Sequence, residues 1–402
     1  MSFSRFQMDH IILEELRVLD LTRVAAGPYA TRIMADFGAE VIKLQTKKIA
    51  TGAESNESAY FRAWNRNKRS ITLDLSYPEA KDLFLELTRI SDVVVENFSP
   101  RVMQNWGLNY NNLKKIRPDL IMISMSAMGQ TGPWKNFVAF GPTLQSLGGL
   151  SYLTSFSKDT PLGLGYAYAD MIAGLYAVVA MLAALEYRQQ TGCGQYIDLS
   201  EYEAVCTTIG PTLLDAFINP DNILPQGNSA EYIPAAPYGC YKCKGEERWC
   251  TVAVFSEDEW RSLCNVLGNP SRAEDERFSS LSNRKKNGLE LDEWLGDWMA
   301  KRSAEEAVQL LQAAGIPAGV VQNAGDLAGD PHLHARNFFT ALDGLDRDGT
   351  KTDTSPMKFI HHKNEPWRAA PSLGRDNYYV YRELLGLTEA EIKSYIERGI
   401  IA

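Results

Sequence analysis

Residues 17–45 read RVLDLTRVAAGPYATRIMADFGAEVIKLQ, and this stretch decides the fold. Residues 17–22 form a short apolar run that predicts a buried strand, and Pro28 stands where a helix begins. The helical pattern continues to Phe37 and ends at Gly38, after which residues 40–45 predict a second strand. The stretch therefore predicts a strand, a helix and a strand in close succession.

The same alternation continues along the chain. Further strands are predicted at 70–75, 92–98 and 120–126, with helical patterns such as YPEAKDLFLELTRI (77–90) between them. Strands and helices that alternate at this spacing indicate an α/β fold, in which a parallel sheet carries helices on both faces.

A long apolar helix is predicted after Asp170. Residues 171–192 are apolar almost all round, turn polar near their end and stop at Gly192, so we expect a buried central helix with a glycine C-cap. A strand at 196–200 and a helical pattern at 201–217 complete the first unit.

The content of Pro, Gly and Asn rises within 221–237, which marks a domain boundary. We expect a large Rossmann-like domain at 1–222, completed by 336–402, and a smaller α+β domain with its linkers at 223–335. The smaller domain begins with paired strands near 239–244 and 248–255. The tail lacks a core pattern of its own, so we expect it to pack on the first domain or on a partner chain.

Composition excludes several classes of protein. The chain has 402 residues, 45% hydrophobic content and a formal net charge of −9, without a long basic run, so a nucleic-acid partner is not expected. The first residues include acidic side chains, and no stretch approaches 18 uncharged apolar residues, so we expect a cytoplasmic protein without a membrane segment.

Neither the cysteines nor the histidines form a metal-binding pattern. The six cysteines are sparse, which favours reduced thiols, and the Cys240–Cys243 pair lacks a second pair or a nearby histidine. His332 and His334 lack an evident third ligand. We therefore expect no metal.

Histidine is also missing where common hydrolytic mechanisms need it. The five histidines are His10, His332, His334, His361 and His362, and none lies between residues 11 and 331. Serine or cysteine triads in the large domain would lack their usual base.

The first strand-to-helix turn lies where doubly wound sheets bind ligands. It holds only Gly27, whereas the dinucleotide fingerprint needs three glycines, so an NAD enzyme is disfavoured. Taken alone, the turn would simply pack a helix on a strand.

Two further segments, NRNKRS (65–70) and NFSPR (97–101), follow strand ends. Lys68, Arg69 and Arg101 could meet phosphates, Asn97 could bind an amide-rich ligand, and Phe98 could cover an adenine or a pantetheine arm. Each segment alone reads as surface charge beside a helix, but three such loops at one sheet edge favour a shared cleft.

Asp170 precedes the long apolar helix and by position is an N-cap. The same placement keeps a carboxylate ionised and available to attack a thioester carbonyl. Residues alone leave both roles open.

Taken together, five ordered segments resemble the class III coenzyme A transferases, the family that includes formyl-CoA and carnitine CoA-transferases. They are residues 17–45, NRNKRSITLDL (65–75), DVVVENFSPRVMQNWGL (92–108), SAMGQTGPW (126–134) and ADMIAGLYAVVAMLAALEYRQQTGCGQYIDLS (169–200). The resemblance implies an interlocked dimer, coenzyme A or acyl-CoA as substrate, and no metal or NAD.

The resemblance also implies roles for particular residues. Asp170 would be the acyl-carrying nucleophile. The coenzyme A contacts would fall on Val24, Ala25, Ala26, Asn67, Lys68, Arg69, Asn97, Phe98 and Arg101. One departure lies at Gln45–Lys48, where most members have an acidic residue, a proline or arginine and a GD pair.

We therefore expect a transferase that moves coenzyme A from an acyl-CoA donor to a carboxylic acid through an aspartyl-CoA thioester. The acceptor would be an aromatic or dicarboxylic acid, such as benzylsuccinate with succinyl-CoA as donor, and Phe137, Phe140, Tyr152 and Leu153 are candidate walls of its pocket. The alternatives are a 2-methylacyl-CoA racemase-like isomerase, disfavoured because AFGPT (139–143) lacks a histidine, and a non-catalytic subunit of a heteromer. The chain would form a homodimer or pair with a related subunit.

Overall fold

The computed structural model describes residues 11–157, 159–219, 225, 233–343, 351–359 and 367–401. The chain divides into a larger unit (Met1–Ser151, Gly163–Asp221 and Ala335–Ala402) and a smaller unit (Tyr152–Leu162 and Asn222–His334). His10, His361, His362 and most of the predicted boundary at 221–237 lie outside the described residues.

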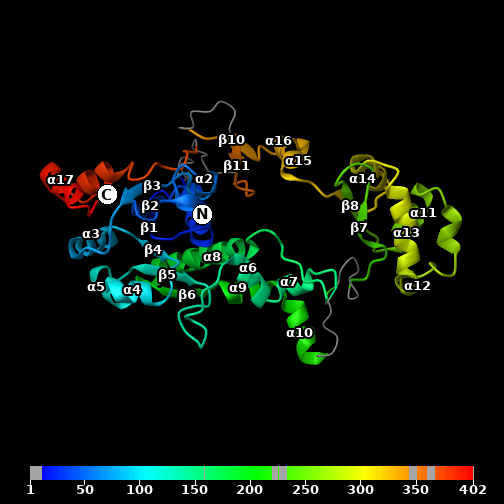
Figure 1. Cartoon of the computed structure of the whole chain (residues 1–402), viewed down its shortest axis with the longest axis horizontal. Helices are drawn as coiled ribbons and strands as arrows, with labels where there is room; N and C mark the ends of the chain where they lie inside the picture. Colours follow the sequence, from blue (N-terminus) through cyan, green and yellow to red (C-terminus); the bar gives the residue numbers. More distant parts are fainter. Residues whose placement is uncertain are drawn as a thin grey trace, which may run out of the picture. The chain divides into compact units, whose positions relative to one another are not determined.

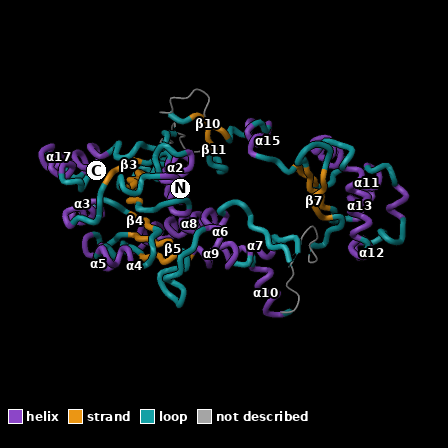
Figure 2. The backbone as a smooth tube through the Cα atoms, viewed as in Figure 1, coloured by secondary structure: helices purple, strands orange, loops and turns teal. Residues whose placement is uncertain are grey.

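The larger unit contains a six-stranded parallel sheet (Figures 1 and 2). Its strands are β1 (Arg17–Asp20), β2 (Glu40–Gln45), β3 (Arg69–Thr72), β4 (Val93–Glu96), β5 (Ile121–Ser126) and β6 (Tyr196–Ser200). They lie in the order β3-β2-β1-β4-β5-β6 and pair in parallel throughout. From β1 the strand order runs outward in one direction through β2 and β3, and from β4 it runs in the other direction through β5 and β6. The switch point therefore lies between β1 and β4, where doubly wound sheets open a crevice for ligands.

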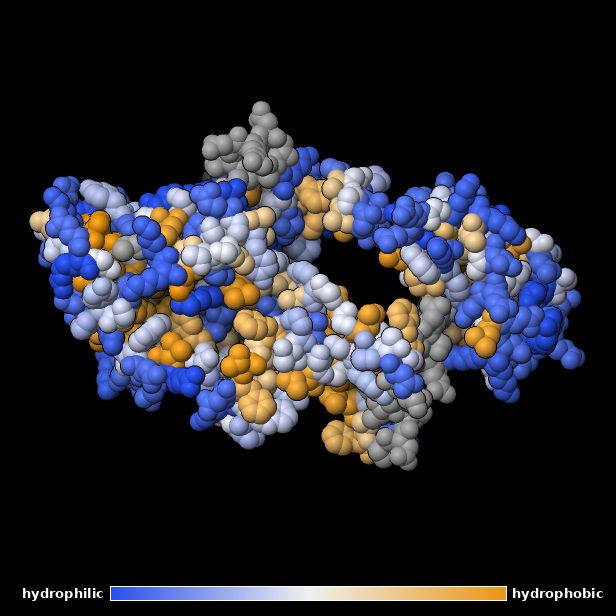
Figure 3. All heavy atoms as spheres, in the orientation of Figure 1, coloured by the Kyte–Doolittle hydropathy of each residue, from blue (hydrophilic) through white to orange (hydrophobic). Residues whose placement is uncertain are grey.

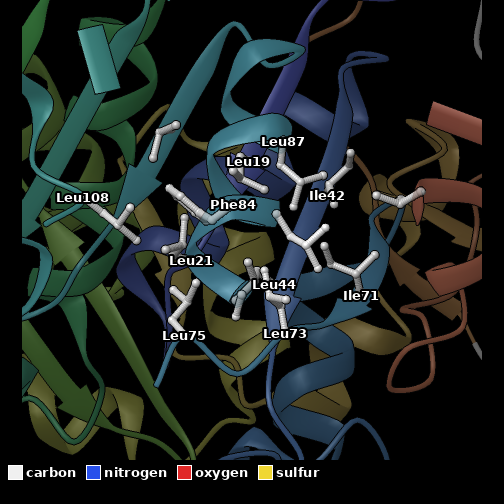
Figure 4. Packing of buried hydrophobic residues seen from close by; sticks show 14 of the residues in the cluster. Leu19, Leu21, Ile42, Leu44, Ile71, Leu73, Leu75, Phe84, Leu87 and Leu108 are labelled. Atoms are coloured by element: carbon white, nitrogen blue, oxygen red, sulfur yellow. The ribbon is translucent and has the colours of Figure 1, made fainter. Parts of the chain in front are cut away.

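Helices cover both faces of this sheet, as predicted. The helices from residue 26 to residue 218 are α1 (Ala26–Asp36), α2 (Ala59–Asn65), α3 (Pro78–Arg89), α4 (Arg101–Trp106), α5 (Tyr110–Ile116), α6 (Gly141–Leu147), α7 (Leu150–Leu153), α8 (Tyr168–Thr191), α9 (Glu201–Thr208) and α10 (Gly210–Ile218), with a short helix η1 (Gly52–Glu54). Alternate strand residues face opposite sides: Leu19 and Ile42 pack against Phe84 of α3 (Figure 4), whereas Val18 and Val41 face α1 and α8.

Helix α8 is only partly buried, so the prediction of a buried helix was wrong for one of its faces. Ala173, Ala177 and Met181 are fully buried and pack toward α1 and the sheet, while Leu175 and Val179 are 49% and 64% exposed. Length and composition alone would allow α8 to cross a membrane, but half of its most apolar window is buried within the protein. A helix of this kind is weak evidence for a membrane segment.

The smaller unit has a three-stranded antiparallel sheet of β7 (Tyr238–Lys242), β8 (Trp249–Ala253) and β9 (Ala318–Val320). The paired strands β7 and β8 were predicted, whereas β9 was not, because three residues are too few for a recognisable alternation. The remaining elements of this part of the chain are α11 (Glu257–Val266), η2 (Pro270–Glu274), α12 (Leu281–Lys286), α13 (Gly288–Met299), α14 (Ala304–Ala313), α15 (Ala324–Ala328) and α16 (Pro331–Ala335).

The tail packs on the larger unit of its own chain. It contains β10 (Phe339–Ala341), β11 (Lys351–Asp353), the π-helix η3 (Tyr379–Leu384) and α17 (Glu389–Glu397). Tyr381 is fully buried, and its hydroxyl donates to the carbonyl oxygen of Thr72 on β3 at 2.8 Å. Burial of Ile392, Ile400 and Ile401 in the same core explains why the tail needs no core of its own.

Candidate active site

A cavity of about 250 Å³ lies at the switch point of the sheet. Its walls come from the turn after β1 (23–26), the turn after β4 (97–100), the end of β5 (125–127) and the segment 137–141. Lys135, Asp170 on α8 and Glu201 on α9 complete the lining. The cavity thus joins loops from three neighbouring strand ends with two acidic side chains.

The turn after β1 is held in a fixed shape by side chains from two other segments. Val24 has a left-handed backbone (φ 66°), and its N–H donates to the Glu54 carboxylate at 2.8 Å. The Asn97 side chain accepts from the N–H of Arg23 and donates to its carbonyl oxygen, both at 2.8 Å. Asn97 therefore joins the turns after β1 and β4 across the switch point.

Gly27, the one glycine of this turn, serves packing. A Cβ atom at this position would lie 2.3 Å from the Cβ of Thr22, so a side chain cannot be accommodated without moving the turn. Gly27 therefore lets the start of α1 pack closely on the segment that follows β1, which is the packing role that the turn alone predicted.

A buried ion cluster lies beneath the turn. The Asp20 carboxylate accepts from the Lys68 ammonium at 3.0 Å and from the hydroxyls of Thr22 and Thr31 at 2.5 and 2.7 Å. Burial by itself raises the pKa of Asp20, but Lys43, Lys68 and the two hydroxyls together bring that pKa below its usual range. The lysines also hold the turn, since Lys43 donates to the carbonyl oxygen of Thr22 and Lys68 to that of Pro28.

Asp170 lies in the first turn of α8, three residues after the N-cap Ala167, so the prediction that it is itself the N-cap was wrong. The N–H of Ala169 donates instead to Oε1 of buried Gln145 on α6 at 3.3 Å. The Asp170 carboxyl group is thereby left to face the cavity, bonded only to its own backbone N–H among the described groups.

Burial raises the pKa of Asp170 to about 6, and the bond to its own N–H opposes this shift. Asp170 is 7% exposed, and no cation acts on its carboxyl group within the part of the chain that the structure describes. The carboxyl group is still mostly ionised at neutral pH, but it is a stronger base than an exposed aspartate.

Gly141 allows the protein to approach this carboxyl group closely. A Cβ atom at Gly141 would lie 2.8 Å from Oδ1 of Asp170 and 2.8 Å from the Cβ of Ala167. The sequence shows several glycines in this region but does not tell which of them meets Asp170, because the two positions come together only through the packing of α6 on α8.

Glu201, which the sequence analysis missed, is the second carboxyl group of the cavity. It is 8% exposed and begins α9 behind the N-cap Ser200. Burial, followed by the negative charge of Asp170, raises the pKa of Glu201 to about 8. Its place among acidic residues at a helix start is a common surface pattern, so the sequence carried no signal of its burial.

The structure brings together six of the predicted site residues around the cavity: Val24, Ala25, Ala26, Asn97, Phe98 and Asp170. Phe137 and Phe140 also line it and are 53% and 65% exposed. The Arg23 guanidinium lies 5.1 Å from the centroid of the Phe98 ring.

The other predicted contacts lie outside the cavity lining. Asn67 bonds to Asp36 and to the backbone of Arg368, and Lys68 is fully buried against Asp20. Arg69 pairs with Glu40 at 2.8 Å, and Arg101 is exposed at the start of α4. Asn67, Lys68 and Arg69 thus bind groups of the protein itself.

The departure at Gln45–Lys48 also lies away from the cavity lining. Gln45 is buried and bonds to Asn56 and Ser70, while exposed Lys48 pairs with Asp74 at 2.7 Å. Within the described ranges, no group of three His, Cys, Asp or Glu side chains is arranged to hold a metal ion.

The fold and cavity are those of a doubly wound α/β protein with a ligand-sized site at its switch point. Residues 13–377 match the family model of CoA-transferase family III. The chain is 33% identical over 377 residues to succinyl-CoA:mesaconate CoA-transferase of Haloarcula hispanica, covering 90% of this chain and 93% of the relative.

It is also 30% identical over 398 residues to the beta subunit of succinyl-CoA–L-malate CoA-transferase of Chloroflexus aurantiacus, covering 97% and 98% of the two chains. Among solved structures, it is similar to a CAIB/BAIF family protein from Brucella suis, with a TM-score of 0.83 and 29% identity over 93% of this chain and 99% of that one. The protein belongs to CoA-transferase family III and is an enzyme that transfers coenzyme A, which confirms the resemblance seen in the sequence.

Proposed function

We propose that this enzyme moves coenzyme A from succinyl-CoA to a small dicarboxylic acid, with Asp170 as the group that carries it between the two. The observation that supports this role is the position of the Asp170 carboxyl group, buried without a cation and directed to the cavity at the switch point. The named relatives act with succinyl-CoA on malate and mesaconate, which supports the donor and the acceptor class.

The reaction requires only exchange of one thioester for another. The Asp170 carboxylate attacks the carbonyl carbon of the donor thioester and the C–S bond breaks. The products of this step are a mixed anhydride of Asp170 with the succinyl group and the thiolate of coenzyme A. The thiolate then attacks the aspartyl carbonyl and releases succinate, which gives an aspartyl-CoA thioester. The acceptor carboxylate reverses these two steps, so the Asp170 carboxylate is regenerated and no ATP is consumed.

Coenzyme A would enter along the turns that line the cavity. The rigid turn of Val24, Ala25 and Ala26 would present backbone groups to the pantetheine arm, with Phe98 covering it. Asn97 would act by holding this turn, since its amide is bonded to Arg23. Arg101 and the Asn67–Arg69 segment would not contact the pantetheine arm near Asp170. We propose that they support the coenzyme A site from outside the cavity lining.

Replacement of the nucleophile tests the mechanism. Asp170→Asn should lower transfer by at least about 10³-fold while the circular dichroism spectrum is unchanged. Hydroxylamine should inactivate the wild type only after incubation with succinyl-CoA and should form a hydroxamate at Asp170. Normal turnover by the variant, or inactivation without a donor, would remove Asp170 from this role.

A substrate screen tests the acceptor. We expect the highest kcat/KM with four- or five-carbon dicarboxylic acids. Benzylsuccinate is a second candidate, because exposed Phe137 and Phe140 line the cavity and could contact an aromatic ring. Incorporation of deuterium at the α carbon of a 2-methylacyl-CoA, without any acceptor, would support the isomerase alternative instead.

The protein would act in the cytoplasm as a dimer. Helix α10 has no buried residue in the described chain, and Phe217 and Ile218 are 86% and 67% exposed. Apolar residues, coloured orange, gather around α10 in Figure 3, and α8 exposes Leu175 and Val179. Exposed apolar side chains on these two helices fit a subunit interface.

Light scattering distinguishes the possible assemblies. The wild type alone should have the mass of a dimer, and Val179→Asp should shift it toward the monomer. One relative is named as a beta subunit, so assembly with an unlike partner chain is the alternative. A purified chain that is monomeric and inactive would favour this alternative.

A further inference from the structure

The proposed mechanism assigns no role to Glu201, although this side chain lines the same cavity as Asp170. Glu201 and Asp170 are 8% and 7% exposed and come from the starts of two packed helices, α9 and α8. Two buried carboxyl groups that line one cavity cannot both ionise readily, because each negative charge opposes the other. The pair therefore binds and releases its protons in two separate steps.

The surroundings of Glu201 do not supply a compensating cation at close range. Arg23 and Lys135 line the cavity, but Arg23 lies over Phe98 and interacts with Glu54, and Lys135 is exposed. On the packed elements, the Tyr176 hydroxyl bonds to Thr207 and Asp198 accepts from the N–H of Gln130. Helix α6 has no titratable side chain. Among the described groups, Asp170 is thus the charge that dominates at Glu201.

Resting on the proposed role of Asp170, we propose that Glu201 is a positioning residue that retains the proton of the Asp170–Glu201 pair. Asp170 is then the ionised member of the pair, and the cavity carries one negative charge when the donor thioester is attacked. The order of the two pKa values agrees: the pKa of Glu201 is raised to about 8 and that of Asp170 to about 6.

Attack moves this single charge without moving the proton. The C–O bond forms at Asp170, the C–S bond breaks, and the electron pair leaves with sulfur, so the negative charge passes from Asp170 to the thiolate. Glu201 keeps its proton throughout. An ionised Glu201 would place a second negative charge beside the developing oxyanion and thiolate, and transfer would slow.

The pH dependence of kcat/KM tests this proposal on the full chain with succinyl-CoA as donor. The pH profile of the wild type should have two limbs. Activity should fall below about pH 6, where Asp170 is protonated, and above about pH 8, where Glu201 is ionised. Glu201→Gln is neutral at every pH and similar in size, so it should keep the acidic limb and lose the alkaline one. At pH 9 the variant should exceed the wild type by about tenfold, because only about one tenth of a group with a pKa of about 8 remains protonated at that pH.

A merely structural role predicts a different result. In that case Glu201→Gln and Glu201→Leu would lower the rate by constant factors at all pH values, and the alkaline limb would remain. Retention of that limb in Glu201→Gln overturns the proposal.

Infrared difference spectroscopy gives a readout that does not depend on turnover. The wild type at pH 7 should show the carbonyl band of a protonated carboxylic acid, which Glu201→Gln should lack. In Asp170→Asn the repulsion is removed, so the band should disappear at a lower pH than in the wild type. Normal transfer by Asp170→Asn contradicts the proposed function. An inactive Asp170→Asn together with an unchanged alkaline limb in Glu201→Gln contradicts only the role of Glu201.

Discussion

Two groups of buried charged residues lie near the same edge of the sheet. The pKa values of their carboxyl groups are shifted in opposite directions. Beneath the first turn, Asp20 is fully buried but surrounded by two ammonium groups and two hydroxyls, and its pKa is lowered. Inside the cavity, Asp170 and Glu201 are buried, no cation of the described residues acts on either carboxyl group, and their pKa values are raised.

The difference separates a carboxylate that holds structure from one that is available for chemistry. The partners of Asp20 satisfy its charge and fix the turn in place. The carboxyl group of Asp170 has no such partners, so it stays basic and the folded state is less stable for containing it. Sites of this kind commonly exchange stability for activity.

Removal of the Asp20 charge should have the largest effect on stability. Asp20→Asn removes the carboxylate that pairs with the buried amino groups of Lys43 and Lys68, so it should lower the free energy of unfolding by about 3–5 kcal/mol. Urea denaturation at pH 7 measures this. The control Glu86→Gln removes an exposed pair with Arg89 and should change stability by less than about 1 kcal/mol. A similar small change for Asp20→Asn would contradict the structural role of the cluster.

Removal of the Asp170 charge should have the opposite sign. The folded pKa of Asp170, about 6, lies above the ordinary 3.8, so its ionisation destabilises the fold above pH 6 and not below pH 4. A difference of about two pKa units at ~1.4 kcal/mol each gives ~3 kcal/mol. Asp170→Asn should therefore gain up to this amount at pH 8 and nothing at pH 4, as measured by denaturation at both values. Equal effects at the two pH values would refute the shift.

A methyl group beside the carboxyl group should cost activity more than stability. Gly141→Ala places a Cβ atom 2.8 Å from Oδ1 of Asp170, so we expect kcat to fall by about 10- to 30-fold, which corresponds to ~1.4–2 kcal/mol. Gly163→Ala is the matched control, since a Cβ atom there would meet no other part of the described chain within 4 Å. Steady-state kinetics of both variants measure the effect. If the two variants behave alike, close approach at Gly141 is not required.

Loss of the Glu54 carboxylate should have the smallest effect. Glu54→Ala removes one exposed hydrogen bond to the N–H of Val24, worth about 0.5–1 kcal/mol. We expect KM for the acyl-CoA donor to rise by less than about fivefold, with kcat unchanged. A larger change in kcat would show that the shape of the first turn controls the chemical step rather than binding.

The sequence was sufficient to predict the parallel sheet, its covering helices and a cleft at the strand ends, whereas the place of Asp170 in the site was implied only by the family resemblance. These features follow from local alternation and from strand ends that meet at one edge of the sheet. The burial of Glu201 could not be predicted, because it depends on β6 placing α9 beside α8, thirty-one positions after Asp170. The long-range pairing of Lys68 with Asp20 was hidden for the same reason, and the basic run 66–69 looked like a phosphate site.

The exposed face of α8 shows a different limit. An apolar pattern all round a helix predicts burial, but it cannot say whether the cover comes from the same chain. The described chain covers only one face, so the exposed remainder of the helix supports the proposed dimer.

The covering of β3 by the tail has a consequence for synthesis. Strand β3 lies at the end of the sheet, and its outward N–H groups at Ser70 and Thr72 donate to the side chains of Asp376 and Asn377 at 2.8 and 2.9 Å. These acceptors are made some three hundred residues later than the strand. Until they emerge from the ribosome, the outward N–H groups of β3 are open to pairing with a neighbouring polypeptide, so a segment translated much later protects this strand from aggregation.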